Sequence, residues 1–399
     1  MAVARVLLGC ELGDGYGHVT RLLPLALALR QQGHDPVFVV NDLSRAEVVL
    51  GPHALPVLPC PQWRNRVAGL PAMRNYTDIL LRHGFVDPVG LRGLARSWQH
   101  LVALLRPQLL VLDHSPVALF ATRGGAVPRL RFGDGFCCPP LETPMPPFTW
   151  WKAGAEAFDA IGERNAIHVA NLAAADLGLP RVDSVARMLE ADAEFLCTFA
   201  ELDHYGARDD ACYEGAVLDT ADGEGPAMPW PDGEGPCAFV YLRADYPYLD
   251  SLVLALKQGG WRAVLHVPGL ASARAQALSG PGLQFSPTLL PMVTVGRRCD
   301  AAITHGGYGT THTLLLAGRP QLLLPRQMEQ TMFGHRVQAL GAGLVVEPSP
   351  QVPGFAPLLK RLQSDAGLAA AAGEFAGRHA DHDSQATVAA LVRRCEALL

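Results

Sequence analysis

Short apolar runs alternate with stretches of helical spacing along much of this chain. Residues 3–9 form one apolar run, and beyond a glycine-rich turn apolar side chains recur every three or four residues until Gly33. A second apolar run occupies residues 36–40. Runs of this length predict buried strands, and the periodicity between them predicts an amphipathic helix. The pattern therefore predicts a strand, a helix and a second strand of one parallel sheet.

The same order of elements recurs further along the chain. A helical stripe over residues 91–105 ends at Pro107, and the apolar run 109–112 that follows ends in Asp113. Asp113 is therefore predicted at the carboxyl edge of a sheet, where open α/β sheets bind ligands. Further predicted elements are a helix over 150–177, strands at 127–132, 238–242, 262–267 and 321–324, and helices over 311–317 and 384–399.

A glycine-rich turn at residues 303–311 carries the most specific chemistry. The segment Ile-Thr-His-Gly-Gly-Tyr-Gly-Thr-Thr predicts a buried strand that runs into a turn and opens a helix. Glycines let backbone N–H groups approach phosphate oxygens, and a helix start carries about half a positive charge. The turn therefore predicts a diphosphate site. Its predicted contributors are Gly306, Gly307, Gly309 and the hydroxyl groups of Thr310 and Thr311.

A second turn of this type follows the first strand. Residues 13–18, Gly-Asp-Gly-Tyr-Gly-His, lead directly into the first predicted helix. Either turn alone is also explained by a conformational need for glycine, and the pair favours phosphate chemistry. At the end of the strand predicted at 238–242, Arg243 is a candidate partner for a diphosphate, with a surface salt bridge as the alternative.

Composition fits two domains with separate cores. The chain has 399 residues, 49% of them hydrophobic and 18% charged, which is enough for two ordinary α/β domains. Residues 219–236 are rich in acidic residues, proline and glycine and lack apolar periodicity, so they predict a linker. The predicted domains are residues 1–218 and 237–378, followed by a terminal helical segment at 379–399.

Charge and cysteine content narrow the class of protein. The net charge of −5 gives no electrostatic reason to expect nucleic acid. Nine cysteines, an odd number without a C-x-x-C pair, favour a reducing cytoplasm over a disulfide framework or a zinc site. No apolar window is long enough to span a membrane, and the short first run predicts a strand instead of a signal peptide. A peripheral membrane contact stays open.

Several motifs occur together in a family order. Over residues 303–346 the chain contains His-Gly-Gly-x-Gly-Thr-Thr, Ala-Gly-x-Pro, Pro325-Arg326, Glu329-Gln330 and Leu-Gly-Ala-Gly. Near the N-terminus Gly17-His18 opens a helix, and a later strand ends in Asp113. In this order the motifs resemble the UDP-glycosyltransferase superfamily of GT-B fold, including bacterial enzymes that glycosylate macrolides and glycopeptides.

The resemblance implies an α/β fold of two Rossmann-like, doubly wound domains that face a cleft. The N-terminal domain would bind the acceptor, the C-terminal domain would bind a nucleoside-diphosphate sugar as co-substrate, and the last helix would pack back on the N-terminal domain. The implied reaction is an inverting hexosyl transfer to a hydroxyl group without a metal or other cofactor.

The resemblance also implies roles for single residues. His18 would be the general base, a role that suits a neutral imidazole near pH 7, and Asp113 would orient it. His305 would meet the charge of the leaving diphosphate. Glu329 and Gln330 would bind hydroxyl groups of the donor sugar.

The chain departs from the family pattern at three positions. Arg21 stands where many members have proline, three residues after the histidine, and we interpret this as a minor difference because a helix can begin without proline. Thr313 stands where many members have a glutamate on the ribose, which leaves uridine or thymidine open. Glu329 replaces a commoner aspartate and leaves the donor hexose open.

Three other classes of protein are alternatives to the transferase. A nicotinamide or flavin dehydrogenase needs glycine where this chain has His18, so the spacing argues against it. A sugar-nucleotide epimerase or phosphorylase, or a non-catalytic nucleotide-binding relative, stays open. The proline-dense segment at 137–147 predicts either a pocket wall, which would favour a small hydrophobic acceptor, or an ordinary surface crossing. The oligomeric state is not predicted.

Overall fold

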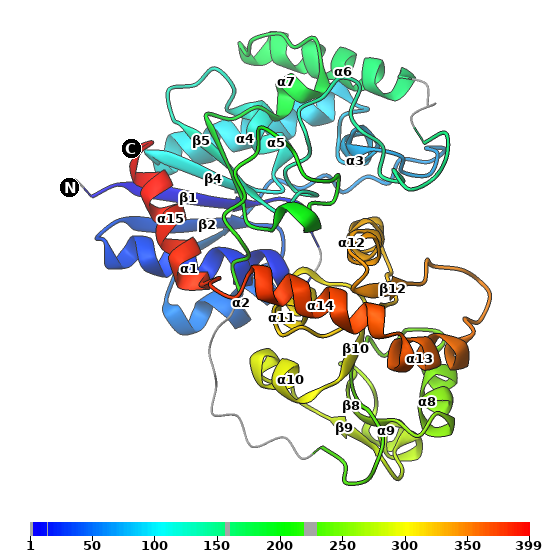
Figure 1. The fold of residues 1–399 in the computed structure, drawn as a ribbon. Coiled ribbons are helices and arrows are strands. Elements are labelled where there is room, and N and C mark those ends of the chain that lie inside the picture. Colours follow the sequence, from blue (N-terminus) through cyan, green and yellow to red (C-terminus); the bar gives the residue numbers. More distant parts are fainter. Residues whose placement is uncertain (1–2, 14, 156–159, 219–229) are drawn as a thin grey trace. The chain divides into compact units, whose positions relative to one another are not determined.

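The computed structural model describes residues 3–13, 15–155, 160–218 and 230–399 (Figure 1). It separates into two compact units, one formed by Met1–Val217 with Asp383–Leu399 and the other by Leu218–His382. Each unit contains one six-stranded sheet in which all neighbouring strands are parallel, as the alternation of strands and helices predicts. Of the predicted linker at 219–236, residues 219–229 lie outside the described residues.

Unit 1 is a three-layer α/β unit. The strands of its sheet lie in the order β3-β2-β1-β4-β5-β6. They are β1 (Arg5–Cys10), β2 (Asp35–Val40), β3 (Val57–Pro59), β4 (Leu109–Asp113), β5 (Arg129–Gly133) and β6 (Ala193–Leu196). The helices are α1 (Gly17–Gln31), α2 (Leu43–Leu50), α3 (Tyr76–Arg82), α4 (Pro88–Leu105), α5 (Pro116–Ala121), α6 (Ile161–Leu177), α7 (Val185–Leu189) and α15 (Ser384–Glu396).

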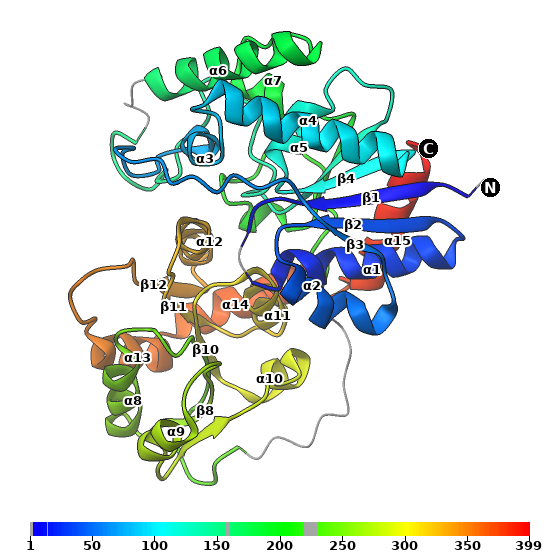
Figure 2. The same ribbon diagram turned by 180° about the vertical axis from the view of Figure 1, so that it is seen from behind.

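The helices of unit 1 cover both faces of the sheet. Helices α1, α2 and α15 lie on one face and α4 and α5 on the other, with α6 outside α4 (Figures 1 and 2). Every residue of β4 is buried, which explains the continuous apolar run over 109–112. The residues of β5 are also buried, and its two arginines, Arg129 and Arg131, pair with Asp192 and Glu194. The direction of winding reverses between the adjacent strands β1 and β4, and the crevice at such a switch point is where doubly wound sheets bind ligands.

The terminal helix α15 packs on α1 within unit 1. Its buried residues include Leu391 and Cys395, and the Thr387 hydroxyl donates to the carbonyl oxygen of Glu214 at 2.8 Å. The Ser384 hydroxyl donates to the carbonyl oxygen of Ala216 at 3.2 Å. These contacts place residues 383–399 in unit 1 although unit 2 precedes them in sequence.

Unit 2 repeats the topology of unit 1. Its strands lie in the order β12-β11-β10-β7-β8-β9, with the switch point between β10 and β7. The strands are β7 (Cys237–Tyr241), β8 (Arg262–His266), β9 (Leu283–Ser286), β10 (Ala301–Thr304), β11 (Gln321–Leu323) and β12 (Gly343–Val345). The helices are α8 (Leu249–Gln258), α9 (Ser272–Leu278), α10 (Met292–Arg298), α11 (Tyr308–Leu316), α12 (Met328–Ala339), α13 (Phe355–Ser364) and α14 (Ala366–Arg378).

Two apolar clusters hold the helices of unit 2 to its sheet. On one face, Leu252 of α8 and Leu359 of α13 pack with strand residues such as Ile303. On the other face, Val295 of α10 and Leu314 of α11 pack with residues of β7, β8 and β10. Among the described residues of either unit, no helix combines the length and apolarity that crossing a bilayer requires.

Two predicted elements differ from the observed ones. The helix predicted over 150–177 begins only at Ile161, and residues 150–155 form turns. Here the Trp150 indole N–H donates to the carbonyl oxygen of His204 at 2.8 Å, a tertiary contact that local helical composition does not encode. The helix predicted over 311–317 begins earlier, at Tyr308, directly after the glycines.

Candidate active site

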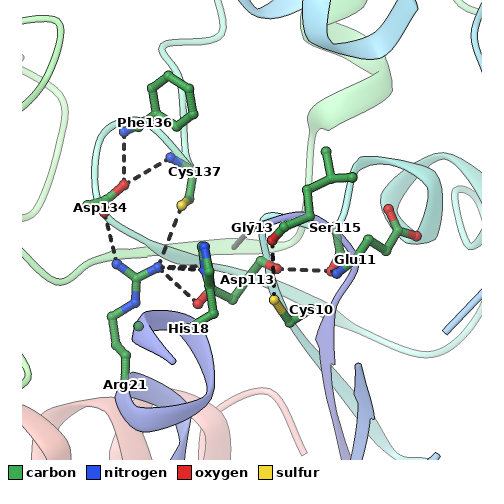
Figure 3. A network of polar contacts seen from close by, with 12 residues as sticks. Cys10, Glu11, Gly13, His18, Arg21, Asp113, Ser115, Asp134, Phe136 and Cys137 are labelled. Atoms are coloured by element: carbon green, nitrogen blue, oxygen red, sulfur yellow. Dashed lines mark hydrogen bonds and ion pairs between the residues drawn. The ribbon is translucent and has the colours of Figure 1, made fainter. Parts of the chain in front are cut away.

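His18 and Asp113 meet at the switch point of unit 1. His18 lies in the first turn of α1, which follows β1, and Asp113 ends β4, whose last pair with β1 is Cys10 and Asp113. Nδ1 of His18 lies 3.1 Å from Oδ1 of Asp113 (Figure 3). The Asp113 side chain is 0% exposed, whereas that of His18 is 18% exposed. An Nδ1–H donor toward the carboxylate leaves Nε2 as the basic nitrogen.

Gly13 makes room for the His18 ring. Its φ of +121° favours glycine, and a Cβ atom built there would lie 2.1 Å from Nε2 of His18. The imidazole therefore occupies the space beside this glycine. The first glycine-rich turn was predicted as a phosphate-type turn, but at Gly13 it accommodates a side chain of the same unit.

Arg21 is a third member of this cluster. Its NH2 group donates to Oδ1 and Oδ2 of Asp113 at 2.8 and 2.9 Å, and its NH1 group donates to Oδ2 of Asp134 at 3.0 Å. The same NH2 nitrogen lies 3.3 Å from Nδ1 of His18 and 3.5 Å from Sγ of Cys137. The sequence analysis treated Arg21 as a minor difference, and that interpretation is wrong. At position i+3 from His18, Arg21 shares a helix face with it, which is the signal that could have identified it.

The charges of the cluster explain the directions in which the pKa values of His18 and Asp113 are shifted. Arg21 and the two aspartates Asp113 and Asp134 sum to one negative charge, which a proton on His18 would neutralise. Burial, the largest single influence, disfavours the His18 cation, but the charge of Asp113 and the hydrogen bond to it outweigh burial, and the pKa of His18 is raised. Burial opposes ionisation of Asp113 as well, yet Arg21 and His18 together lower its pKa.

The loop after β4 is fixed by a buried carboxylate at the end of β1. Glu11 accepts hydrogen bonds from the backbone N–H groups of Val117 and Ala118, in the first turn of α5, at 2.8 and 2.7 Å. Its own N–H donates to the Ser115 hydroxyl, which donates to the carbonyl oxygen of Asp113. Burial raises the pKa of Glu11 to about 8. These bonds tie the ends of β1 and β4 together beside the His18 and Asp113 pair.

His114 completes the surroundings of His18. It adopts a left-handed φ of +47°, and its ring centroid lies 6.0 Å from that of His18. Among the described residues its Nε2 has no hydrogen-bond partner, and burial lowers its pKa to about 3. The sequence analysis missed His114, although it directly follows Asp113 at the sheet edge.

Three side chains of this cluster have the chemistry of metal ligands. One ligand atom each from His18, His114 and Cys137 lie within 4.8 Å of one another. The sequence alone does not bring these three residues together, because they come from three separate segments. The Arg21 guanidinium contacts both His18 and Cys137, and burial raises the pKa of the Cys137 thiol well above its ordinary value. The adjacent guanidinium and the protonated thiol of Cys137 both disfavour a metal ion at these ligand atoms, so the set fits a metal poorly.

In unit 2, His305 joins three strand ends. Its Nδ1 lies 2.7 Å from the carbonyl oxygen of Leu324, after β11, and its Nε2 accepts from the N–H of Arg243, after β7, at 3.0 Å. Burial lowers the pKa of His305 to about 4, so the ring is neutral near pH 7. Both ring nitrogens are engaged by backbone groups. Neither ring nitrogen of His305 is therefore free for the predicted contact with a diphosphate. In the structure the ring joins the loops that follow β7 and β11.

The start of α11 has the form predicted for an anion site, with one correction. The first bond within this helix runs from the Thr311 N–H to the carbonyl oxygen of Gly307, so the N–H groups of Gly309 and Thr310 precede it. No described atom lies within 4 Å of a Cβ built on Gly307 or Gly309. Thr311, however, is 0% exposed, so its hydroxyl group faces the core and cannot contribute as predicted.

The loops after β7 and β11 carry two cations. Arg326 donates to both carboxylate oxygens of Asp245 at 2.7 and 2.8 Å, and Nε of Arg243 lies 3.7 Å from the same carboxylate. All three side chains are at least a third exposed. The sequence analysis proposed Arg243 but gave no role to Arg326 or Asp245, because the pairing joins segments 81 residues apart.

The two predicted sugar-binding residues lie at the start of α12. Gln330 accepts from the N–H of Arg326 at 3.0 Å, and the carboxylate of Glu329 lies 3.3 Å from the amide nitrogen of Gln327. The carbonyl oxygen of Gln330 would lie 3.4 Å from a Cβ on Gly306, whose φ is +80°. Loops after β7, β10 and β11 thus converge, bringing the predicted residues of unit 2 to one edge of its sheet.

Comparison with known proteins places this architecture in a class. The calicheamicin glycosyltransferase CalG4 aligns with a TM-score of 0.74 at 20% identity, over 100% of this chain and 99% of that chain. The spinosyn rhamnosyltransferase SpnG aligns with a TM-score of 0.68 at 18% identity, over 98% of this chain and 100% of that chain. The two units therefore have the fold of GT-B glycosyltransferases.

Sequence similarity is confined to parts of the chain. Residues 274–398 match the family described as erythromycin biosynthesis protein CIII-like, C-terminal domain. The vancomycin aglycone glucosyltransferase of Amycolatopsis orientalis is 49% identical over 47 residues, which are 12% of this chain and 12% of that enzyme. The matched segment is thus well under two thirds of that relative's length. The chain is thus similar to bacterial macrolide and glycopeptide glycosyltransferases in parts of its sequence, and its units have the GT-B fold.

Proposed function

We propose that this protein is an inverting, metal-independent glycosyltransferase that moves a hexosyl group from a nucleoside-diphosphate sugar to a hydroxyl group of a small-molecule natural product. The observation that carries the proposal is the 3.1 Å contact between Nδ1 of His18 and Oδ1 of Asp113. It lies at the switch point of a sheet in a chain with the GT-B fold.

Unit 1 supplies the base. Nε2 of His18 takes the proton of the acceptor hydroxyl while Asp113 holds the ring through Nδ1 and stabilises the imidazolium that forms. The acceptor oxygen then attacks the anomeric carbon from the face opposite the leaving diphosphate, so the configuration inverts. The raised pKa of His18 gives it more affinity for this proton than an ordinary histidine has.

Unit 2 binds the donor. The N–H groups of Gly309 and Thr310 and the start of α11 stabilise the charge that develops on the departing diphosphate. Arg243 and Arg326, with Asp245 between them, add one net positive charge on neighbouring loops. Glu329 and Gln330 bind hydroxyl groups of the sugar. Backbone dipoles and guanidinium groups can neutralise a diphosphate, which is why the proposed reaction does without a metal ion.

The relatives indicate the substrate classes to test first. SpnG has been solved with thymidine diphosphate and with the spinosyn aglycone, which favours thymidine diphosphate sugars as donors and natural-product aglycones as acceptors. The name of the vancomycin aglycone glucosyltransferase indicates glycopeptide aglycones as a second class of acceptor to test. Nine free thiols, all in the described part of the chain, support a reducing cytoplasm as the site of action.

The test combines nucleotide binding with transfer. Thermal shifts are measured with thymidine and uridine diphosphates and their glucose and rhamnose conjugates, because a ligand at 100 times its Kd stabilises by about 2.7 kcal/mol. Sugar transfer to macrolide and glycopeptide aglycones is then followed by mass spectrometry. His18→Gln should keep the nucleotide-induced shift and lose transfer. Nucleotide-sugar turnover without an acceptor would favour an epimerase or phosphorylase, and the absence of any nucleotide effect would overturn the proposal.

A further inference from the structure

We propose that Arg21 is a positioning residue that divides the negative charge of Asp113 between itself and His18, and so sets the basicity of the histidine. Arg21 needs no contact with a substrate for this. The inference deepens the proposed function, since it concerns the base of that reaction. It rests on the geometry of the Arg21, Asp113 and His18 cluster.

The guanidinium is held on both sides by buried carboxylates. Arg21 is 4% exposed and bridges Asp113 at the end of β4 to Asp134 after β5. Asp134 is itself fixed, because its Oδ1 accepts from the N–H groups of Phe136 and Cys137 at 3.1 and 3.0 Å (Figure 3). Such a planar fork, anchored at two points, fixes the orientation of Asp113 toward His18.

The distances show that Arg21 and His18 compete for the carboxylate of Asp113. The Asp113 carboxylate accepts two contacts from Arg21 at 2.8 and 2.9 Å and one from His18 at 3.1 Å. A carboxylate that already accepts from a cation attracts a second proton donor less strongly. His18 should therefore be less basic than it would be beside Asp113 alone, and Arg21 should keep enough of the imidazole neutral near pH 7 to act as a base.

Other titratable groups face this cluster and must be held constant. His114 and Cys137 contact His18 or Arg21, and His204 acts on Asp134 through its charge. The influence of Arg21 on His18 exceeds that of Asp134. Removing the charges of Arg21 and Asp134 together leaves the net charge unchanged. The carboxylate of Asp113 then loses its contacts with Arg21 and keeps only its contact with His18.

The experiment measures the ionisation of His18 directly. Protein labelled with 13C at the histidine Cε1 positions is titrated by NMR, and His18 is identified among the 14 histidines by the signal that His18→Gln removes. The variants are the charge-matched double variant Arg21→Met with Asp134→Asn, and the conservative Arg21→Lys. A lysine cannot bridge two carboxylates as a guanidinium does. Circular dichroism checks that each variant is folded.

The double variant should raise the pKa of His18 by about one unit, a tenfold change in proton affinity. Arg21→Lys should raise it by less, because the charge stays and the bridge is lost. If the double variant does not fold, the lysine variant carries the test. An unchanged or lowered pKa of His18 in the folded variants overturns the inference.

A second readout separates this inference from the proposed function. Where transfer is detected, the acidic limb of the pH profile of kcat/KM should move upward with the pKa of His18 in the same variants. A merely structural role for Arg21 would lower stability without moving that limb. If the wild-type protein transfers no sugar, the proposed function fails, but the NMR titration still decides whether Arg21 sets the ionisation of His18.

Discussion

A Cβ atom at Gly13 would lie 2.1 Å from Nε2 of His18, so the ring of the proposed base rests against a position that tolerates no side chain. The turn after β1 thereby fixes where the imidazole can lie, while Asp113 fixes its rotation from the opposite nitrogen. The backbone of one strand end and the carboxylate of its neighbour together determine the geometry of the histidine.

Replacing Gly13 by alanine should displace His18 and abolish most of the transfer. The φ of +121° makes alanine strained by about 1–3 kcal/mol, and the new methyl group collides with the ring. Loss of an aligned general base costs on the order of 10²–10⁴-fold in rate. Initial rates of transfer and thermal denaturation measure the two effects separately.

Gly15 provides the matched control for this variant. Its φ of +87° is also strained for alanine, but no described atom lies within 4 Å of a Cβ built there. Gly15→Ala should therefore lose a similar amount of stability and retain transfer. Equal rates in the two variants would show that the contact between Gly13 and His18 does not matter for activity.

Asp113→Asn should impair the reaction by selecting the wrong tautomer. The asparagine oxygen can still accept from Arg21, and its amide can donate to Nδ1 of His18, which would place the ring proton on Nε2. In a comparable hydrolase triad this substitution lowers kcat by about 10⁴-fold while the geometry is kept. The check is the rate at saturating substrates, with nucleotide affinity expected to stay unchanged. A modest decrease would assign Asp113 a structural role.

The places of the proposed catalytic pair could be predicted from local sequence, because Asp113 ends an apolar run and His18 opens the helix that follows the first glycine-rich turn. The positions of His18 and Asp113 follow from strands whose boundaries are visible in the pattern. The i+3 spacing predicts that Arg21 lies beside His18, but the bridge that Arg21 forms could not be predicted in this way. Its meaning depends on Asp134, 113 residues away, and on burial that charged residues rarely adopt unless they are paired.

In unit 2, too, local sequence predicts the elements but not the orientation of the polar side chains. The glycines of the 303–311 segment predict a helix start, and α11 does begin there. Whether a polar side chain faces the ligand or the fold depends on neighbouring strands. His305 is engaged by loops that follow β7 and β11, and Thr311 points into the core, so tertiary contacts decided both.

The activity should fall on the acidic side with an apparent pKa above 6.5, the ordinary value for histidine. His18 must be neutral to accept a proton, and its raised pKa keeps it protonated to a higher pH than usual. The profile of kcat/KM against pH measures this in the free enzyme. An acidic limb at or below 6.5 would contradict the raised pKa.

Stability should depend on pH through the same pair in opposite senses. The lowered pKa of Asp113 contributes stability above its ordinary value of 3.8, and that contribution is lost as the pH falls through the folded value. The raised pKa of His18 contributes stability fully below 6.5, and this is lost as the pH rises through the folded value. The free energy of unfolding of wild type and of His18→Gln is measured by urea denaturation from pH 3 to 9. The difference between the two proteins should be largest below pH 6.5.

His305→Ala should weaken nucleotide binding without changing its pH dependence. The substitution leaves the carbonyl oxygen of Leu324 and the N–H of Arg243 without the ring that joins them. Arg243 is exposed, so its N–H can bond to water, whereas Leu324 is buried and an unsatisfied buried group costs about 1–3 kcal/mol. Because the pKa of His305 is about 4, its charge does not change near neutrality. Calorimetric titration with thymidine diphosphate should show at least about fivefold weaker binding, corresponding to about 1 kcal/mol.

His266→Ala is the control for this last variant. His266 ends β8, and its Nδ1 lies 3.2 Å from the carbonyl oxygen of Ser286 at the end of β9. Its ring makes the same kind of contact at the same edge of the sheet, but with the end of β9 instead of the loops that follow β7 and β11. Its removal should lower stability and leave the nucleotide affinity unchanged. If both variants bind thymidine diphosphate as the wild type does, the convergence of loops around His305 serves the fold alone and does not form the donor site.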